Sequence, residues 1–300
     1  MKLTHRQAVL LMVACTMMWS IAGVVTRHLD QARSFEVTFW RSFFTLVSLL
    51  VILPLIQGRA LLSKFKQGGA FLWVSGVCWS VMFTAFMTAL TMTSVANVLI
   101  TLSLGPMLTA LFAWVFIGHK LPARTLIAIV VAGAGIAYMY AAQINLSDVK
   151  QLTGMLVALG VPIAAAVNWT LVQHSQAQGH DVDLVPAVMV GALISSVVTL
   201  PLSMPFQATG HDVALLAMLG LVQLAIPCTL AVVCARYLKA PEVSLLALLE
   251  IIFGIALAWL GANEKPGSPV LIGGCLVLGA LAFNEWLGMR ERAIKLSSNP

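Results

Sequence analysis

The sequence has 300 residues, of which 60% are apolar and 9% are charged, whereas soluble proteins carry about 25% charged residues. This composition excludes a soluble globular protein and predicts a chain embedded in a lipid bilayer. The net charge of +6 does not indicate a nucleic acid partner, because the basic residues lie in short gaps between apolar runs and not on one face.

Ten apolar segments are long enough to cross a bilayer as helices, which takes about 20 residues each. The first follows basic residues as a signal peptide would, but its apolar run of about 18 residues predicts a retained helix. No charged residue or histidine lies between Gln67 and Gly118, and a stretch of that length suits two crossings with a turn at 91–94. The predicted spans are 7–26, 36–56, 69–90, 95–117, 124–142, 153–173, 184–204, 213–234, 243–261 and 269–288.

The distribution of basic residues predicts the orientation of these spans. With the N-terminus inside, 12 of the 17 lysines and arginines lie on the inner segments, 4 lie on the outer segments, and Arg41 lies within a span. Because cytoplasmic loops are enriched in basic residues, this bias predicts that both termini are cytoplasmic.

The two halves of the chain resemble each other weakly. Ala113-Trp114 aligns with Ala258-Trp259 at an offset of 145, and Trp19-Ser20 aligns with Trp169-Thr170 at an offset of 150. The predicted units are 1–147 and 148–290, with five helices each, followed by a cytoplasmic tail at 291–300. Since five is odd, the second unit enters the membrane from the opposite side. The prediction is therefore an all-α membrane protein with ten helices in a 5+5 inverted-topology repeat, an architecture frequent among secondary transporters.

The segments "LSLGPMLTALFAWVFIGHKLPARTLIAIVVAGAGIAYMY" (102–140) and "LLALLEIIFGIALAWLGANEKP" (245–266) resemble the EamA-like domain of the drug/metabolite transporter superfamily. The family pattern has a mid-helix proline, an Ala-Trp pair, a Gly-acid-x-Leu turn and then a glycine-rich helix 5. His119 replaces the acid in the first copy, while Glu264 keeps it in the second. The usual Glu-Pro of helix 9 is Glu250-Ile251. The resemblance implies a bacterial inner-membrane transporter, more often an exporter, of amino acids or similar metabolites.

Arg41 is an unusual residue for a membrane span, and it matches an arginine that this family often has near the start of helix 2. It lies about 7.5 Å past Glu36 at the outer end of the helix. One interpretation is that the side chain snorkels back to the interface. The other is that it faces the interior, where it is either held by carbonyls or an acid or binds a substrate carboxylate, to which a guanidinium donates two parallel hydrogen bonds.

Glu250 is the acid predicted to lie deepest in a span, about 10 Å from the inner end of helix 9. A carboxyl at that depth is neutral, paired or facing water, so it suits either proton coupling or a structural hydrogen bond. A direct pair with Arg41 is strained, because the two backbone positions differ by roughly 12 Å in depth within a hydrocarbon layer of about 30 Å.

Amides and tryptophans within the spans complete the predicted substrate-binding residues. Each has a structural alternative, since amides bond neighbouring helices and mid-span tryptophans pack between them. Beside Arg41, the set consists of Trp19, Trp79, Asn97, Asn168, Trp169 and Gln223.

No cofactor or metal is expected. The five cysteines fall in apolar runs without a CxxC, no histidine pair has ligand spacing, and there is no Walker A motif. An intramembrane protease would need Gly-x-Ser-Gly or paired glutamates with a mid-span histidine, and neither pattern is present. A channel, a facilitator or a non-transporting subunit stays open as an alternative to a carrier. The four-residue spacing of Gly133, Ala137 and Ala141 predicts close packing with another helix or with a second copy in a homodimer.

Overall fold

The computed structural model describes residues 3–32, 34–58, 60–117, 122–142, 149–177, 185–234, 237, 246–247 and 249–297, and these residues form helices and no strands. In chain order the elements are α1 (His5–Thr26), α2 (Ser34–Gln57), α3 (Ala60–Met92), α4 (Val95–Leu102), α5 (Gly105–Ile117), α6 (Ala123–Ala141), α7 (Val149–Ala177), α8 (Val185–Ser203), α9 (Gly210–Met218), the π-helix η1 (Leu219–Ala225), α10 (Ile226–Cys234), α12 (Leu249–Ala262) and α13 (Ser268–Ser297).

These elements match the ten predicted crossings in order. Eight helical stretches of the described chain are long and apolar enough to span a membrane, and two shorter apolar helices, Ala123–Met139 and Leu249–Ala262, occupy the places of helices 5 and 9. α13 continues beyond the predicted span as far as Ser297, so most of the predicted tail is helical. Part of the predicted helix 9, residues 243–245 and 248, lies outside the described residues.

Breaks in the helices coincide with glycine and proline. α3 has a kink at Gly69, where φ is +48°, a backbone conformation that glycine adopts without steric cost. The fourth crossing is split at Ser103 and Leu104, just before Pro106, which has no N–H to donate. The π-helix η1 ends two residues before Pro227, whereas Pro162 lies within the continuous α7.

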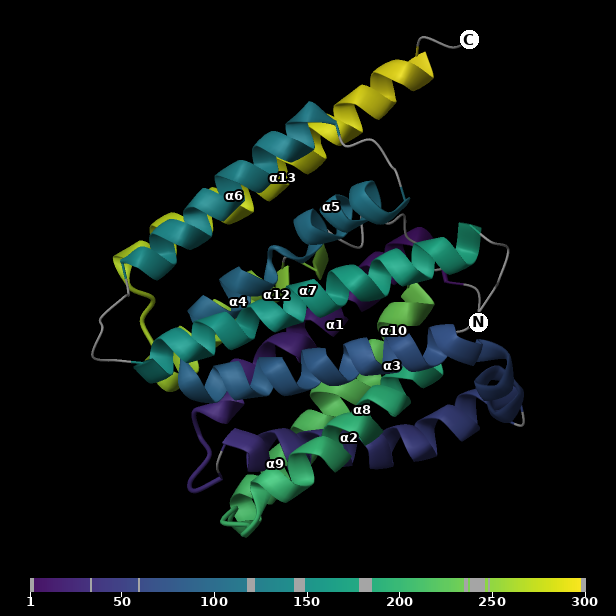
Figure 1. The fold of residues 1–300 in the computed structure, drawn as a ribbon, viewed down its shortest axis with the longest axis vertical. Helices are drawn as coiled ribbons and strands as arrows, with labels where there is room; N and C mark the ends of the chain where they lie inside the picture. The colour runs from purple at the N-terminus through teal and green to yellow at the C-terminus, as the bar shows by residue number, and fades with distance from the viewer. Residues whose placement is uncertain are drawn as a thin grey trace.

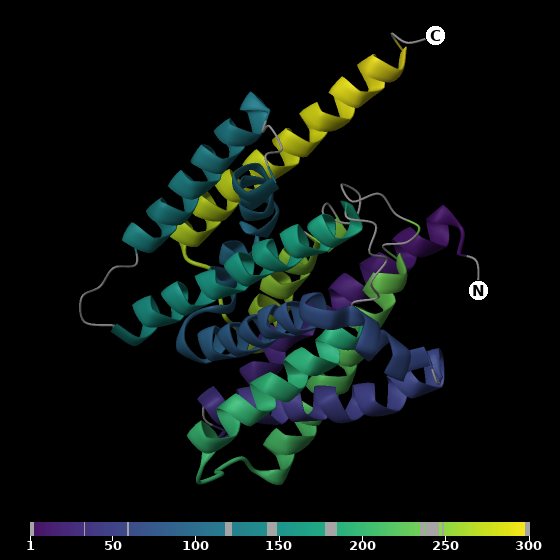
Figure 2. The same ribbon diagram turned by 45° about the vertical axis from the view of Figure 1, so that its right-hand side comes forward.

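The packing of the helices repeats when the two halves are exchanged. α3 packs on α7 and α8, and the equivalent crossing, formed by α9, η1 and α10, packs on α1 and α2. α1 contacts α12 as α7 contacts α4 and α5. The pairs α2–α8 and α6–α13 join equivalent helices, and the second pair lies side by side along one edge of the bundle (Figures 1 and 2). This arrangement is the expected 5+5 inverted repeat.

Both chain ends lie at one end of the bundle (Figure 1), as an even number of crossings requires. We call this the terminal end and the opposite one the distal end, which the charge bias predicts to be outside. The largest core cluster joins both repeats and includes Val37, Leu90, Val95, Leu216 and Val277. The two repeats therefore share a core and pack as one body.

Candidate functional site

Arg41 lies inside the protein, on α2. Its side chain is 1% exposed, so the interior-facing interpretation holds and the snorkelling one does not. Nη1 donates to Gln223 Oε1 at 3.0 Å, and Nη2 donates to the carbonyl oxygen of Phe83 at 3.1 Å. Nε is buried without a hydrogen-bond partner among the described residues. A buried guanidinium with an unused N–H keeps one donor for a further hydrogen bond.

Gln223 connects this cation to the first helix of the chain. It is buried within η1, and its Nε2 donates to the carbonyl oxygen of Trp19 at 3.3 Å. Close packing fixes the geometry, because a Cβ on Gly220 would lie 2.9 Å from the carbonyl oxygen of Arg41. The hydroxyl of Thr45 donates to that same oxygen at 2.8 Å. The network therefore joins α1, α2 and α3 of the first repeat to η1 of the second.

Aromatic rings of α3 flank the guanidinium. The rings of Phe83 and Phe86 lie 5.7 and 5.6 Å from the Arg41 Cζ atom, which is cation–π range. Trp79 packs against Phe83, with ring centroids 5.6 Å apart. Positions 79, 83 and 86 share one helical face. This spacing was readable from the sequence, although the two phenylalanines were not among the predicted site residues.

A second buried polar pair occupies the equivalent place in the other half. Ser75 of α3 donates to Asn168 Oδ1 of α7 at 2.6 Å, and both side chains are buried. This bond joins the third crossing to the sixth, and the bond from Gln223 to Trp19 joins the eighth to the first, so the two bonds connect equivalent helices of the two repeats. The hydroxyl of Ser195 of α8 bonds those of Ser42 and Thr84 at 2.9 and 3.0 Å, a cluster that sequence reasoning missed.

Among the described side chains, neither Asn97 nor Glu250 is hydrogen-bonded to Arg41. Asn97 is fully buried in the first turn of α4, where its Nδ2 donates to Thr93 Oγ1 at 3.0 Å. Glu250 lies in the first turn of α12, and the ion pairs of the described residues include neither it nor Arg41. The side chain of Trp169 and the turn that holds His119 lie outside the described residues. Substrate binding by all of these residues stays a prediction.

Three carboxylates tie the repeats together at the distal end. Glu36 of α2 accepts from the backbone N–H groups of Gln207 and Ala208. Asp212 of α9 accepts from three backbone N–H groups of the loop at 30–32 and from that of Thr209. Its carboxylate also lies near Asp30 and His211, within 4.8 Å, but both oxygens already anchor the loop. The sequence analysis uses Glu36 only to mark the outer end of helix 2, and Asp212 is not among the predicted residues.

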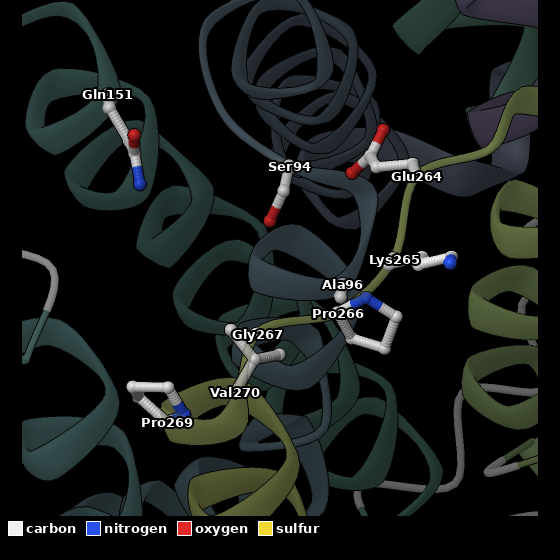
Figure 3. Close-up of a pocket in the computed structure, with 9 residues that line it drawn as sticks. All are labelled: Ser94, Ala96, Gln151, Glu264, Lys265, Pro266, Gly267, Pro269 and Val270. Carbon is white, nitrogen blue, oxygen red and sulfur yellow. The ribbon is translucent and has the colours of Figure 1, made fainter.

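Glu264, the third carboxylate, pairs with Arg27 at 2.6 Å. It lines a pocket of about 290 Å³ that also includes Ser94 and Ala96, Gln151 of α7, and the loop into α13 (Figure 3). The pocket lies at the distal end and not beside Arg41. Its lining contains none of the predicted substrate-binding residues.

Comparison with known proteins agrees with the resemblance seen in the sequence. The profile of the EamA-like transporter family matches residues 6–141 and again 152–285. No curated protein matches the chain. A crystal structure, described only as that of a protein, is 16% identical, covers 95% of this chain and 98% of its own, and superposes with a TM-score of 0.57. At that identity it supports the fold alone. Because the family profile covers most of the chain in two copies, the protein belongs to the EamA-like transporter family.

Proposed function

We propose that this membrane transporter-like protein is a secondary carrier that exports small amphiphilic metabolites, such as amino acids, across the bacterial inner membrane by alternating access. Family membership supports transport, and the inverted repeat supports alternating access, because two mirrored halves can rock about a shared site. The observation that carries the proposal is Arg41, a buried cation with a free N–H at the junction of both repeats.

The substrate class follows from the chemistry at that junction. A carboxylate would take a charge-assisted hydrogen bond from the unused Nε of Arg41. The rings of Phe83, Phe86 and Trp79 supply apolar surface beside it. A cation that accepts a carboxylate, next to aromatic rings, suits amino acids with an apolar side chain.

The export step requires a driving force, and Glu250 is our proposed proton carrier. It is partly buried in a membrane helix, where a carboxyl that alternates between protonated and charged forms can couple proton entry to solute exit. Facilitated diffusion is the competing mechanism, because it needs no titrating group within the membrane.

Counterflow in proteoliposomes tests the carrier proposal. Vesicles loaded with an unlabelled amino acid should accumulate the labelled one transiently above its external concentration, since a carrier exchanges solutes through one site. A panel that pairs each amino acid with its amine lacking the carboxylate then tests the substrate class. Ion current at channel rates, or vesicles that equilibrate without overshoot, would favour a channel or a channel-like facilitator, and the absence of any flux would favour a non-transporting subunit.

A further inference from the structure

Arg27, the last residue before the loop that follows α1, is a hub at the distal end. Its Nε pairs with Glu264 Oε2 at 2.6 Å, Nη1 donates to the carbonyl oxygen of Leu90 at 2.5 Å, and Nη2 donates to that of Thr93 at 2.7 Å. Each nitrogen of the guanidinium therefore has an acceptor. One side chain joins the end of α1, the end of α3 and the loop after α12.

Glu264 extends this hub to the next helix. Its second oxygen, Oε1, accepts from the backbone N–H of Val95 at 2.6 Å, and Val95 is the first residue of α4. A helix start has unsatisfied N–H groups and a positive dipole end, so a carboxylate there is stabilising. The acid comes from the second repeat, while the turn between α3 and α4 belongs to the first. The turn between α3 and α4 is therefore held at its start by Arg27 of the first repeat and at its end by Glu264 of the second.

Partial burial strengthens the pair between Arg27 and Glu264. The side chains of Arg27 and Glu264 are 26% and 22% exposed, so solvent screens them less than a fully exposed pair. The opposing surface is tightly packed, since a Cβ on Gly23 of α1 would press on the side chain of Val95, which is fully buried. Separating α1 from α4 requires breaking this contact and the charged bonds together.

The sequence rules out the same pair at the terminal end. The repeat offset of 145 places His119 opposite Glu264, and the offset of 150 places Ala177 opposite Arg27. No lysine or arginine occurs anywhere between residues 151 and 235, which includes the end of helix 6 and the loop that follows it. In two mirrored halves, an ion pair whose equivalent position in the other half lacks both charged partners makes the two access states unequal in free energy.

We infer that Arg27 and Glu264 form a one-sided gate, a charge latch that closes the carrier at the distal end and must open for solute to leave there. The inference rests on the proposed alternating access, which supplies the opening motion. The latch makes the distally closed state the resting state. Neutralising it shifts the population towards the distally open state without any change at Arg41.

Thiol accessibility measures this shift without substrate or transport. The reporter is Val95→Cys, in a background where the five native cysteines are alanine, because Val95 is fully buried at the seam that opening would expose. A membrane-impermeant maleimide should label the parent slowly. Glu264→Gln should label at least about tenfold faster, since hydrogen bonds to charged groups contribute more than neutral ones. The matched control is Asp30→Asn, which breaks the exposed pair with His211 on the same face and should leave the rate within about twofold, since exposed pairs contribute little.

A second variant covers the case in which Glu264→Gln does not fold. Arg27→Lys keeps the charge but cannot reach Glu264 and the carbonyls of Leu90 and Thr93 together, so it should give an intermediate rate. Fast labelling of the parent, or equal rates in the parent and both latch variants, would overturn the latch. Loss of counterflow with the labelling pattern intact would instead remove the proposed transport and leave the latch standing.

Discussion

The variant Arg41→Lys tests whether Arg41 binds the substrate or only stabilises the fold. Lysine keeps the positive charge, but one ammonium cannot contact Gln223, Phe83 and a ligand with the fixed geometry of a guanidinium. The expected loss is one charge-assisted hydrogen bond to the substrate, about 1.5–3 kcal/mol. At 1.4 kcal/mol for each factor of ten, the Kd for carboxylated solutes should rise about 10- to 150-fold.

The assay is binding of an amino acid and of its amine without the carboxylate to the purified protein. Arg41→Lys should weaken the first and leave the second within about threefold, since the amine never used the lost bond. Arg290→Lys is the matched control, because Arg290 also packs over a ring, that of Trp286, but is exposed. Equal losses for both ligands would refute the binding role and assign Arg41 to folding. Unchanged affinity for both would place the site elsewhere.

Three further variants test separate parts of the structure. Glu250→Gln should abolish uptake driven by a pH gradient yet preserve solute exchange in proteoliposomes, and unchanged pH-driven uptake would exclude proton transfer through this residue. Asp212→Asn should lower the free energy of unfolding by about 1–3 kcal/mol in a denaturation experiment, because an amide N–H₂ would face backbone donors of the loop at 30–32. Gly220→Ala should lower the free energy of unfolding by about 1–3 kcal/mol, since its Cβ would meet backbone atoms of Thr45 and Arg41 at 2.8 and 2.9 Å. Gly133→Ala is the control, because a Cβ at Gly133 has open space and should not destabilise the protein. Equal melting temperatures for the two variants would contradict the close packing at Gly220.

The crossings were predictable because the bilayer imposes a simple rule. A segment in hydrocarbon must bond its own backbone and present apolar side chains, so length and hydropathy alone locate helices such as α1 and α8. The ends of the helices were harder to predict, because the rule does not apply to residues outside the hydrocarbon layer. α3 begins nine residues before its predicted start at 69, on a polar stretch that precedes the Gly69 kink, and hydropathy cannot detect such a helix.

The sequence predicts residues of the candidate site better than it predicts the hydrogen bonds between them. A cation or an amide within a span is conspicuous, so the sequence predicts Arg41 and Gln223 as site residues. Their bond joins residues 182 positions apart, and no periodicity in the sequence reports a contact between two repeats. Arg27 shows the same limit. In the sequence, Arg27 is one of the four basic residues on the outer segments, and Glu264 is the acid of the family's turn motif. Only the fold brings the two side chains together.

The asymmetry between the halves carries more functional information than their likeness. By the repeat offsets, Arg41 corresponds to Gly191 and Glu250 corresponds to Gly105, so each intramembrane charge has a glycine as its counterpart. Gly191 packs against the backbone of Gly76 and Ser80, where an arginine could not fit. Identical halves would give two access states of equal energy and no direction. The scaffold therefore provides two symmetric states. Arg41, Glu250 and Glu264, which have no charged counterpart at the equivalent position of the other repeat, are where this chain can acquire substrate charge preference, coupling and a resting conformation.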